Sequence, residues 1–145
     1  MKSKRLHEEA DEITYVLVLD TGEEVTGALL DFAKKQQIRT ASFTAIGALR
    51  ELTLGYFDWQ KKEYEKIHVA EQVELLSLAG NIVSSKDGPK LHAHIVVGKR
   101  DGTAHGGHLV DAIVRPTLEM MIVESTAARL ERQQDEASGL PLIKF

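Results

Sequence analysis

The histidines are the residues of this sequence best suited to chemistry. Four of the six lie between positions 92 and 108: His92, His94, His105 and His108. Neutral imidazoles bind divalent transition metals, and zinc, nickel, copper and iron all accept them. The sequence contains no cysteine, which excludes disulfides, thiolate nucleophiles and cysteine-based zinc sites. A metal ion in this protein would therefore be held by histidine, aspartate or glutamate.

The spacing of these histidines predicts that three of them converge. His92 and His94 are two residues apart in a predicted strand at 91–97, and such side chains point to the same side of a strand. A turn at 99–103 reverses the chain and returns the segment from His105 to His108 beside that strand, where it delivers a third imidazole. Gly106 and Gly107 in this segment permit a close backbone approach. Three imidazoles usually leave a zinc ion a fourth position for water or another ligand. We expect a divalent metal here, with zinc preferred and nickel, iron or copper as alternatives.

Other interpretations of the same residues stay open. The two strand histidines can be half-buried residues satisfied by hydrogen bonds, with His105 and His108 as polar loop residues. Glu119 lies in an otherwise apolar segment and is either an outer hydrogen-bond acceptor for a ligand imidazole or a solvent-facing edge residue. His105 is the other candidate for such an outer role. Spacing alone is compatible with both interpretations, so the metal site is a hypothesis at this point.

A strand and a helix are predicted near the N-terminus. Residues 13–19 are rich in β-branched and aromatic types and end at a turn, which is typical of a strand. Thr21 and Glu24 match a capping box, and apolar residues then recur at helical spacing as far as Ala33. The apolar side of this helix is expected to cover a sheet.

The rest of the chain reads mostly as strands. Apolar segments separated by turn signals are expected at 41–46, 52–57, 64–69, 73–83, 91–97 and 118–123. Residues 109–114 are expected to form a helical turn, and Met120 and Met121 to fill the core. Short connections favour antiparallel neighbours. The predicted class is α+β, with a central antiparallel sheet and few flanking helices.

Length and composition predict one domain. The chain has 145 residues, of which 43% are hydrophobic and 28% are charged, and this is ordinary for a globular protein with one core. Residues 1–145 are expected to form a single domain. Within it, residues 1–12 are expected as a charged N-terminal extension and residues 127–145 as a C-terminal hairpin, with Pro141 favouring an edge position.

The charge of the chain disfavours DNA as a partner. The formal net charge is −4, and basic residues occur only in scattered pairs, whereas nucleic-acid binding depends on clustered cations. The sequence has no apolar stretch typical of a secretory signal and no apolar run of membrane-spanning length, so we expect no membrane association and a cytoplasmic location.

Four segments resemble the plants and prokaryotes conserved domain, or PPC domain, and they occur in that family's order. They are VELLSLAGNI, LHAHIVV, GGHLV and PTLEMMI, at residues 73–82, 91–97, 106–110 and 116–122. The resemblance extends from Ile13 to Val123. It implies an α+β fold with a central antiparallel sheet and a homotrimer.

The resemblance also bears on the metal site and on DNA binding. In prokaryotic members of the family a metal is bound by histidines that match His92, His94 and His108, whereas His105 lies outside the matched motif. Plant members carry AT-hook segments of the type Arg-Gly-Arg-Pro, and this sequence contains none.

Three functions follow as hypotheses. The first is a metal-binding oligomeric module that recognises a small molecule or a partner protein. The second is a metal-dependent hydrolase or lyase, for which Glu119 is the candidate general base. The third is a DNA-binding or transcription-regulatory protein.

Overall fold

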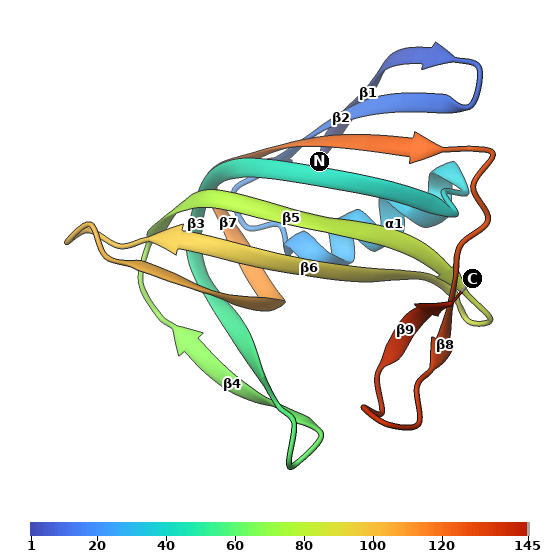
Figure 1. The fold of residues 1–145 in the computed structure, drawn as a ribbon. Helices are drawn as coiled ribbons and strands as arrows, with labels where there is room; N and C mark the ends of the chain where they lie inside the picture. The colour runs from blue at the N-terminus through green and yellow to red at the C-terminus, as the bar shows by residue number, and fades with distance from the viewer. Residues whose placement is uncertain (145) are drawn as a thin grey trace.

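The structure is a computed structural model that describes residues 1–144 (Figure 1). Along these residues the chain forms nine strands and one helix. In order they are β1 (Lys2–Glu9), β2 (Glu12–Asp20), α1 (Val25–Gln36), β3 (Thr40–Asp58), β4 (Glu63–Val69), β5 (Val73–Ser85), β6 (Gly88–Gly98), β7 (Ala104–Ser125), β8 (Glu131–Gln134) and β9 (Pro141–Lys144). The predicted α+β class is correct, with strands predominating.

All the strands join one sheet, whose centre is formed by the two longest. β7 pairs with β2, β3 and β6, and β3 pairs with β4, β5 and β7. Neighbouring strands run antiparallel, apart from one parallel pairing between Ser84 of β5 and Glu131 of β8. The predicted central antiparallel sheet is therefore confirmed.

β3 and β7 are longer than the sequence pattern predicts. The segments expected at 41–46 and 52–57 belong to the single strand β3, because Gly47 lies at a bulge rather than a turn. A Cβ at Gly47 would lie 2.4 Å from the carbonyl oxygen of Thr117, so glycine is required for this approach. The helical turn predicted for 109–114 is wrong, because these residues pair with the second half of β3 as part of β7.

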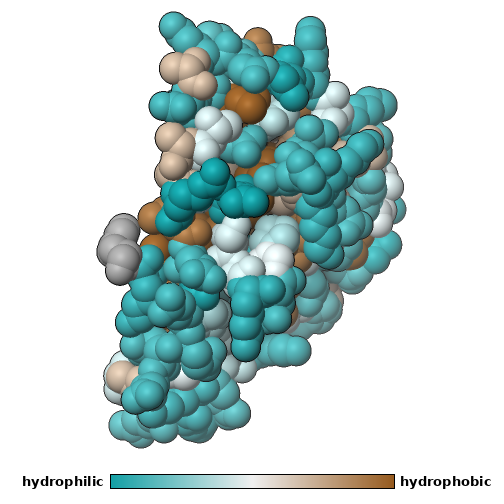
Figure 2. Space-filling view, turned by 90° about the vertical axis from the view of Figure 1, so that its right-hand side faces the viewer, coloured by the Kyte–Doolittle hydropathy of each residue, from teal (hydrophilic) through white to brown (hydrophobic). Residues whose placement is uncertain are grey.

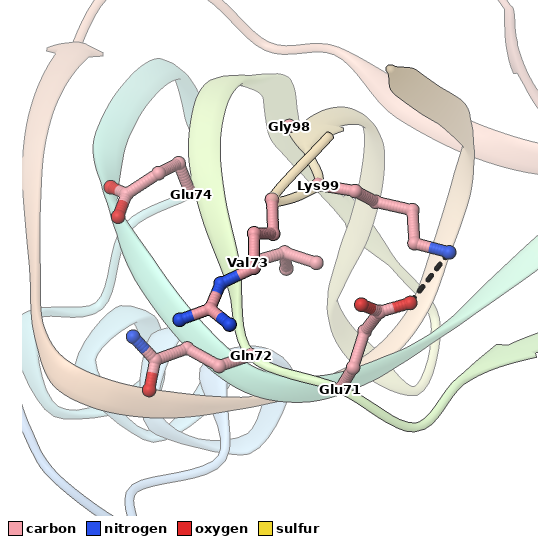
Figure 3. Close-up of a pocket in the computed structure, with 7 residues that line it drawn as sticks. Glu71, Gln72, Val73, Glu74, Gly98 and Lys99 are labelled. Atoms are coloured by element: carbon pink, nitrogen blue, oxygen red, sulfur yellow. Dashed lines mark ion pairs between the residues drawn. The ribbon is translucent and has the colours of Figure 1, made fainter. Parts of the chain in front are cut away.

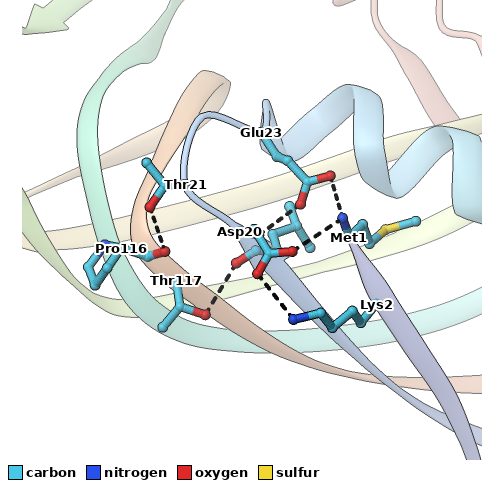
Figure 4. Close-up of polar contacts among 8 residues, drawn as sticks. Met1, Lys2, Asp20, Thr21, Glu23, Pro116 and Thr117 are labelled. Atoms are coloured by element: carbon cyan, nitrogen blue, oxygen red, sulfur yellow. Dashed lines mark hydrogen bonds and ion pairs between the residues drawn. The ribbon is translucent and has the colours of Figure 1, made fainter.

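The helix begins later than predicted. Its N-cap is Glu24, whose carboxylate accepts hydrogen bonds from the backbone N–H groups of Thr26 at 2.8 Å and Gly27 at 2.6 Å. Thr21 instead donates its hydroxyl to the carbonyl of Pro116 at 2.9 Å (Figure 4). The predicted capping box is wrong because the acidic residue caps the helix itself. No helix within residues 1–144 is long and apolar enough to cross a membrane.

The hydrophobic core lies between α1 and one face of the sheet. Phe32 of α1 packs edge-on against Tyr15 of β2, with ring centroids 5.3 Å apart. Met120 is buried as predicted, but Met121 is 41% exposed because successive side chains of β7 alternate between the two faces. The opposite face of the sheet therefore carries apolar side chains in the open.

That open face is the most apolar exposed region of the sheet. Its exposed side chains are Ile46, Leu76, Val96 and Met121. They come from β3, β5, β6 and β7, which are neighbours in the sheet. Figure 2 shows the right-hand side of the view in Figure 1, which is largely hydrophilic with a few hydrophobic side chains at the surface. Apolar groups that gather on one face often mark an interaction surface.

Both ends of the chain pair with the sheet. The charged residues expected as an extension form β1, which is exposed along its length and pairs with β2. The Met1 amino group lies 2.6 Å from the Glu23 carboxylate and 3.7 Å from that of Asp20 (Figure 4). The segment expected as a C-terminal hairpin contains β8 and β9, which pair antiparallel, and Phe145 lies outside the described residues.

Candidate metal centre

Three histidines converge on the open side of the sheet. His92 and His94 lie on β6, and His108 lies on β7, where it pairs directly with His94. Ala93 and Ile95, which alternate with the first two histidines, are buried in the core, so the imidazoles point the other way. The structure therefore brings together the three residues that strand alternation and the returning chain predict.

The imidazole nitrogens lie near enough to share one ion. One nitrogen from each ring lies within 4.8 Å of the other two, and the ring centroids are 5.2, 5.3 and 5.8 Å apart. Zinc–nitrogen bonds of about 2.0–2.1 Å place the ligands of one tetrahedral ion roughly 3.4 Å apart. The nitrogens lie close to that separation and three imidazoles are ligands that divalent metals accept, so the donor set fits such an ion.

His108 is held in position by an aromatic neighbour. Tyr64 of β4 stacks on the imidazole with ring centroids 4.5 Å apart and an angle of 27° between the planes. The tyrosine ring lies over Gly55 of β3, where a Cβ would be 2.8 Å from the Tyr64 Cδ1 atom. The absence of a side chain at Gly55 thus allows the stacking that orients His108.

One nitrogen of His108 lacks a partner. Its Nδ1 atom is buried and accepts or donates no hydrogen bond within the described residues. Buried polar atoms are nearly always satisfied, and a metal ion or an ordered water are the usual partners of such a nitrogen. This unpartnered atom is a second indication that the histidine group holds something.

Burial favours the neutral form of two of the imidazoles, those of His92 and His108. Burial, with smaller contributions from His92 and His94, lowers the pKa of His108 to about 4. The pKa of His92 is also lowered, first by burial and then by the positive charge of Arg132 and by His94. Because the neutral imidazole is the form that binds metal, these shifts preserve the binding form in mildly acidic solution.

A cavity of about 160 Å³ opens beside the histidines. His92 and His108 line it together with Tyr64, the cations Lys90 and Arg132, and the apolar residues Leu91, Leu140, Pro141 and Leu142. Sequence reasoning did not identify Tyr64 or Arg132. Each comes from a strand distant in sequence from the histidines, and no local spacing signals their approach.

The two outer candidates do not join the group. His105 pairs with Val97, so it lies on the other side of the β6–β7 ladder from His108, and it is exposed. Glu119 pairs with Val18 and Ile46, farther along β7, and is exposed beside the open face. Neither belongs to the set of close ligand atoms formed by the three histidines.

Comparison with known proteins identifies relatives over the whole sheet. The profile of the family described as the Plants and Prokaryotes Conserved (PCC) domain, abbreviated PPC above, matches residues 6–126. This span contains the three histidines and Tyr64, whereas Arg132 lies beyond its end. No curated protein matches the sequence.

Solved structures of similar proteins support the same family relationship. A plant- and prokaryote-conserved protein from Pyrococcus horikoshii is 36% identical, with 91% of each chain covered and a TM-score of 0.86. A metal-containing protein from Archaeoglobus fulgidus is 35% identical, with 100% of each chain covered and a TM-score of 0.85. A protein from Bacteroides thetaiotaomicron, whose name proposes DNA binding, is 34% identical over 96% of this chain and 95% of its own, with a TM-score of 0.86. The chain belongs to the plants and prokaryotes conserved domain family.

Proposed function

We propose that this protein is an oligomeric metal-binding module that presents a divalent ion, zinc in the first instance, to a small molecule or a partner protein. His92, His94 and His108 hold the ion. Three protein ligands leave a tetrahedral ion one open position, where the metal acts as a Lewis acid toward an oxygen or nitrogen donor. The cavity beside the histidines gives such a donor a place to enter.

The observation that carries this proposal is the convergence of three imidazole nitrogens within 4.8 Å of one another, on two adjacent strands. The unpartnered Nδ1 atom of His108 supports it. So does the metal-containing relative from Archaeoglobus fulgidus, which matches this chain along its full length.

Metal content tests the proposal. The protein is stripped with a chelator, incubated with equimolar zinc, desalted and analysed by elemental mass spectrometry. We expect one ion per chain, and its loss in the His92→Ala and His94→Ala variants. His105→Ala is the matched control, because that histidine lies on the same hairpin outside the group. A parent protein that retains no zinc, or a His94→Ala variant that retains as much as the parent, would refute the proposal.

Self-association is part of the proposal. The family resemblance implies a homotrimer, and the exposed apolar residues Ile46, Leu76 and Met121 supply a surface for it, with exposures of 61%, 53% and 41%. Light scattering after gel filtration should give a mass three times that of the chain, and Ile46→Glu should reduce it. A monomeric parent protein would remove self-association from the account.

A cytoplasmic location stays a prediction.

DNA binding is the second candidate, and the names of relatives from Bacteroides thetaiotaomicron and Ralstonia eutropha favour it. The net charge of −4 opposes it, because phosphate contacts need clustered cations. Fluorescence anisotropy with an A/T-rich duplex at low salt distinguishes the two. Binding that weakens steeply as salt is added would favour DNA, and no binding would dismiss it.

A hydrolase or lyase needs a general base near the metal. Glu119, the carboxylate that the sequence offers for this role, lies along β7 away from the three histidines. The geometry therefore supports ligand recognition better than catalysis.

A further inference from the structure

The guanidinium of Arg132 is buried beside the histidines, and no carboxylate among the described residues pairs with it. Arg132 is 8% exposed, and burial lowers the pKa of its guanidinium, which nonetheless stays charged. Its Nη1 atom donates to the carbonyl of Pro141 at 2.7 Å, and its Nη2 atom donates to Oδ1 of Asn81 at 2.6 Å. Both acceptors are neutral, and within residues 1–144 its Nε atom has no partner.

Such an arrangement is costly unless something compensates for it. Buried charges in proteins are normally paired or bound to an ion, since removing them from water carries a penalty of several kcal/mol. Arginine is also the residue that recognises carboxylates through two parallel hydrogen bonds. A free Nε donor on a buried guanidinium is therefore typical of a site for an anion.

The position of Arg132 is fixed relative to the histidines. Asn81 of β5 pairs directly with His92 of β6, so the two side chains lie on the same face of the sheet. The hydrogen bond from Arg132 to Asn81 thus anchors the guanidinium next to His92, and both residues line the same cavity. The cation and the metal ligands belong to one site.

The cavity that they share suits a small anion with an apolar part. Lys90 and Arg132 line it, none of the carboxylates of residues 1–144 does, and Leu91, Leu140 and Leu142 provide apolar contact. Its volume of about 160 Å³ is well below the roughly 300–1,000 Å³ of pockets for drug-sized ligands. A molecule of only a few non-hydrogen atoms would fill it.

We propose that this cavity binds a small organic carboxylate, whose carboxylate group pairs with Arg132 and whose second oxygen donor occupies the open position on the metal. This inference rests on the proposed metal site and names the class of ligand that the site takes. Lys90 at the edge of the cavity adds to the positive potential, and the leucines hold the carbon chain of the ligand.

The test measures ligand binding and metal content separately. Butyrate, 2-hydroxybutyrate and inorganic phosphate are titrated by calorimetry into the zinc-loaded protein and into the metal-free protein at fixed ionic strength. We expect 2-hydroxybutyrate to bind at least tenfold more tightly than butyrate with zinc present, and the difference to vanish without zinc. Phosphate binding that exceeds both would overturn the assignment to a carboxylate.

Two variants identify the role of Arg132. Arg132→Gln should weaken 2-hydroxybutyrate binding at least tenfold while zinc stays at one ion per chain. Asn81→Asp keeps the shape of the pocket but gives the guanidinium an internal carboxylate, so it should weaken ligand binding in a protein that still folds. Lys99→Gln, at a distant cation, is the control and should bind as the parent does. Carboxylate affinities unchanged in Asn81→Asp would overturn the inference even if zinc binds fully, whereas a protein without zinc would fail the metal proposal itself.

Discussion

Two cations flank the hairpin formed by β5 and β6, and their surroundings are opposite. Lys99, just after β6, forms an ion pair with Glu71 at 2.5 Å in a surface hollow (Figure 3). Arg132, near the other end of the hairpin, is buried and has only neutral acceptors among the described residues. The hollow around Lys99 contains the acids Glu71 and Glu74, whereas no carboxylate that the structure describes lines the cavity that Arg132 shares with the histidines.

The pKa directions express the same contrast. The hydrogen bond and charge of Glu71 raise the pKa of Lys99, because they stabilise its charged form. Burial lowers the pKa of Arg132, because nothing comparable offsets the lost hydration. Lys99 has a carboxylate partner within the chain, so its charge contributes to the stability of the fold. Arg132 lies in a cavity without such a partner among the described residues, and this indicates a binding site for a ligand.

Breaking the hydrogen bond to Asn81 should have the largest effect on stability. Asn81→Leu removes an acceptor from a buried guanidinium, and a hydrogen bond to a charged group contributes about 1.5–3 kcal/mol. We expect the free energy of unfolding in urea to fall by that amount. Asn81→Leu should lower the free energy of unfolding more than Glu71→Gln does. Equal losses in the two variants would contradict the contrast between buried Arg132 and exposed Lys99.

A methyl group at Gly55 should disturb the packing of the site. The added Cβ of Gly55→Ala would meet the ring of Tyr64 at 2.8 Å, and overpacking of this kind costs about 1–3 kcal/mol. The displaced tyrosine would also release His108, so zinc affinity should fall in a competition titration. Adding Tyr64→Leu to the Gly55→Ala variant removes the clash with the tyrosine ring. If the double variant were no more stable than Gly55→Ala alone, contact with the Tyr64 ring would not be the cause of the lost stability.

Acid should destabilise the metal-free protein through His108. The folded pKa is about 4 and the ordinary value is 6.5, so between these values the unfolded chain binds more protons than the folded one. The contribution of His108 to the free energy of unfolding should therefore decrease as pH falls from about 6.5 to about 4 and level off below it. His108→Asn should flatten this dependence, whereas His68→Asn should not. Equal slopes in both variants would contradict the assignment.

The smallest effect is expected at the exposed end. Glu71→Gln removes the partner of Lys99, and exposed ion pairs contribute about 0.2–1 kcal/mol. The difference in unfolding free energy should shrink further in concentrated salt, since exposed charges are screened. If Glu71→Gln lowered the free energy of unfolding by more than this range, and the effect persisted in concentrated salt, the exposed ion pair would contribute more to stability than we expect.

Local patterns predict that histidines converge here, and metal binding by them stays a prediction. The alternation of side chains on one strand and the return of the next strand place His92, His94 and His108 together, and both features extend over fewer than twenty residues. The long strands were predicted less well, because the glycine at Gly47 signals a turn and a bulge equally. Glu24 was assigned to the third position of a capping box because glutamate is not a favoured N-cap residue, whereas in the structure it is the N-cap.

The rest of the site depends on contacts that no local pattern encodes. Arg132 reaches Asn81 across 51 positions of sequence, and it lies in a terminal segment that reads only as a hairpin. Tyr64 reaches His108 because a glycine on the intervening strand leaves room. Such approaches are set by the curvature of the whole sheet, which the order of apolar residues does not specify.

X-ray absorption spectroscopy of the zinc-loaded protein tests the central claim most directly. The account predicts three imidazole nitrogens at about 2.0–2.1 Å and one further light donor. The spectrum should also change when 2-hydroxybutyrate is added. A zinc ion with fewer than three imidazole ligands, or a spectrum identical in the His94→Ala variant, would contradict the claim that these three side chains form the metal centre.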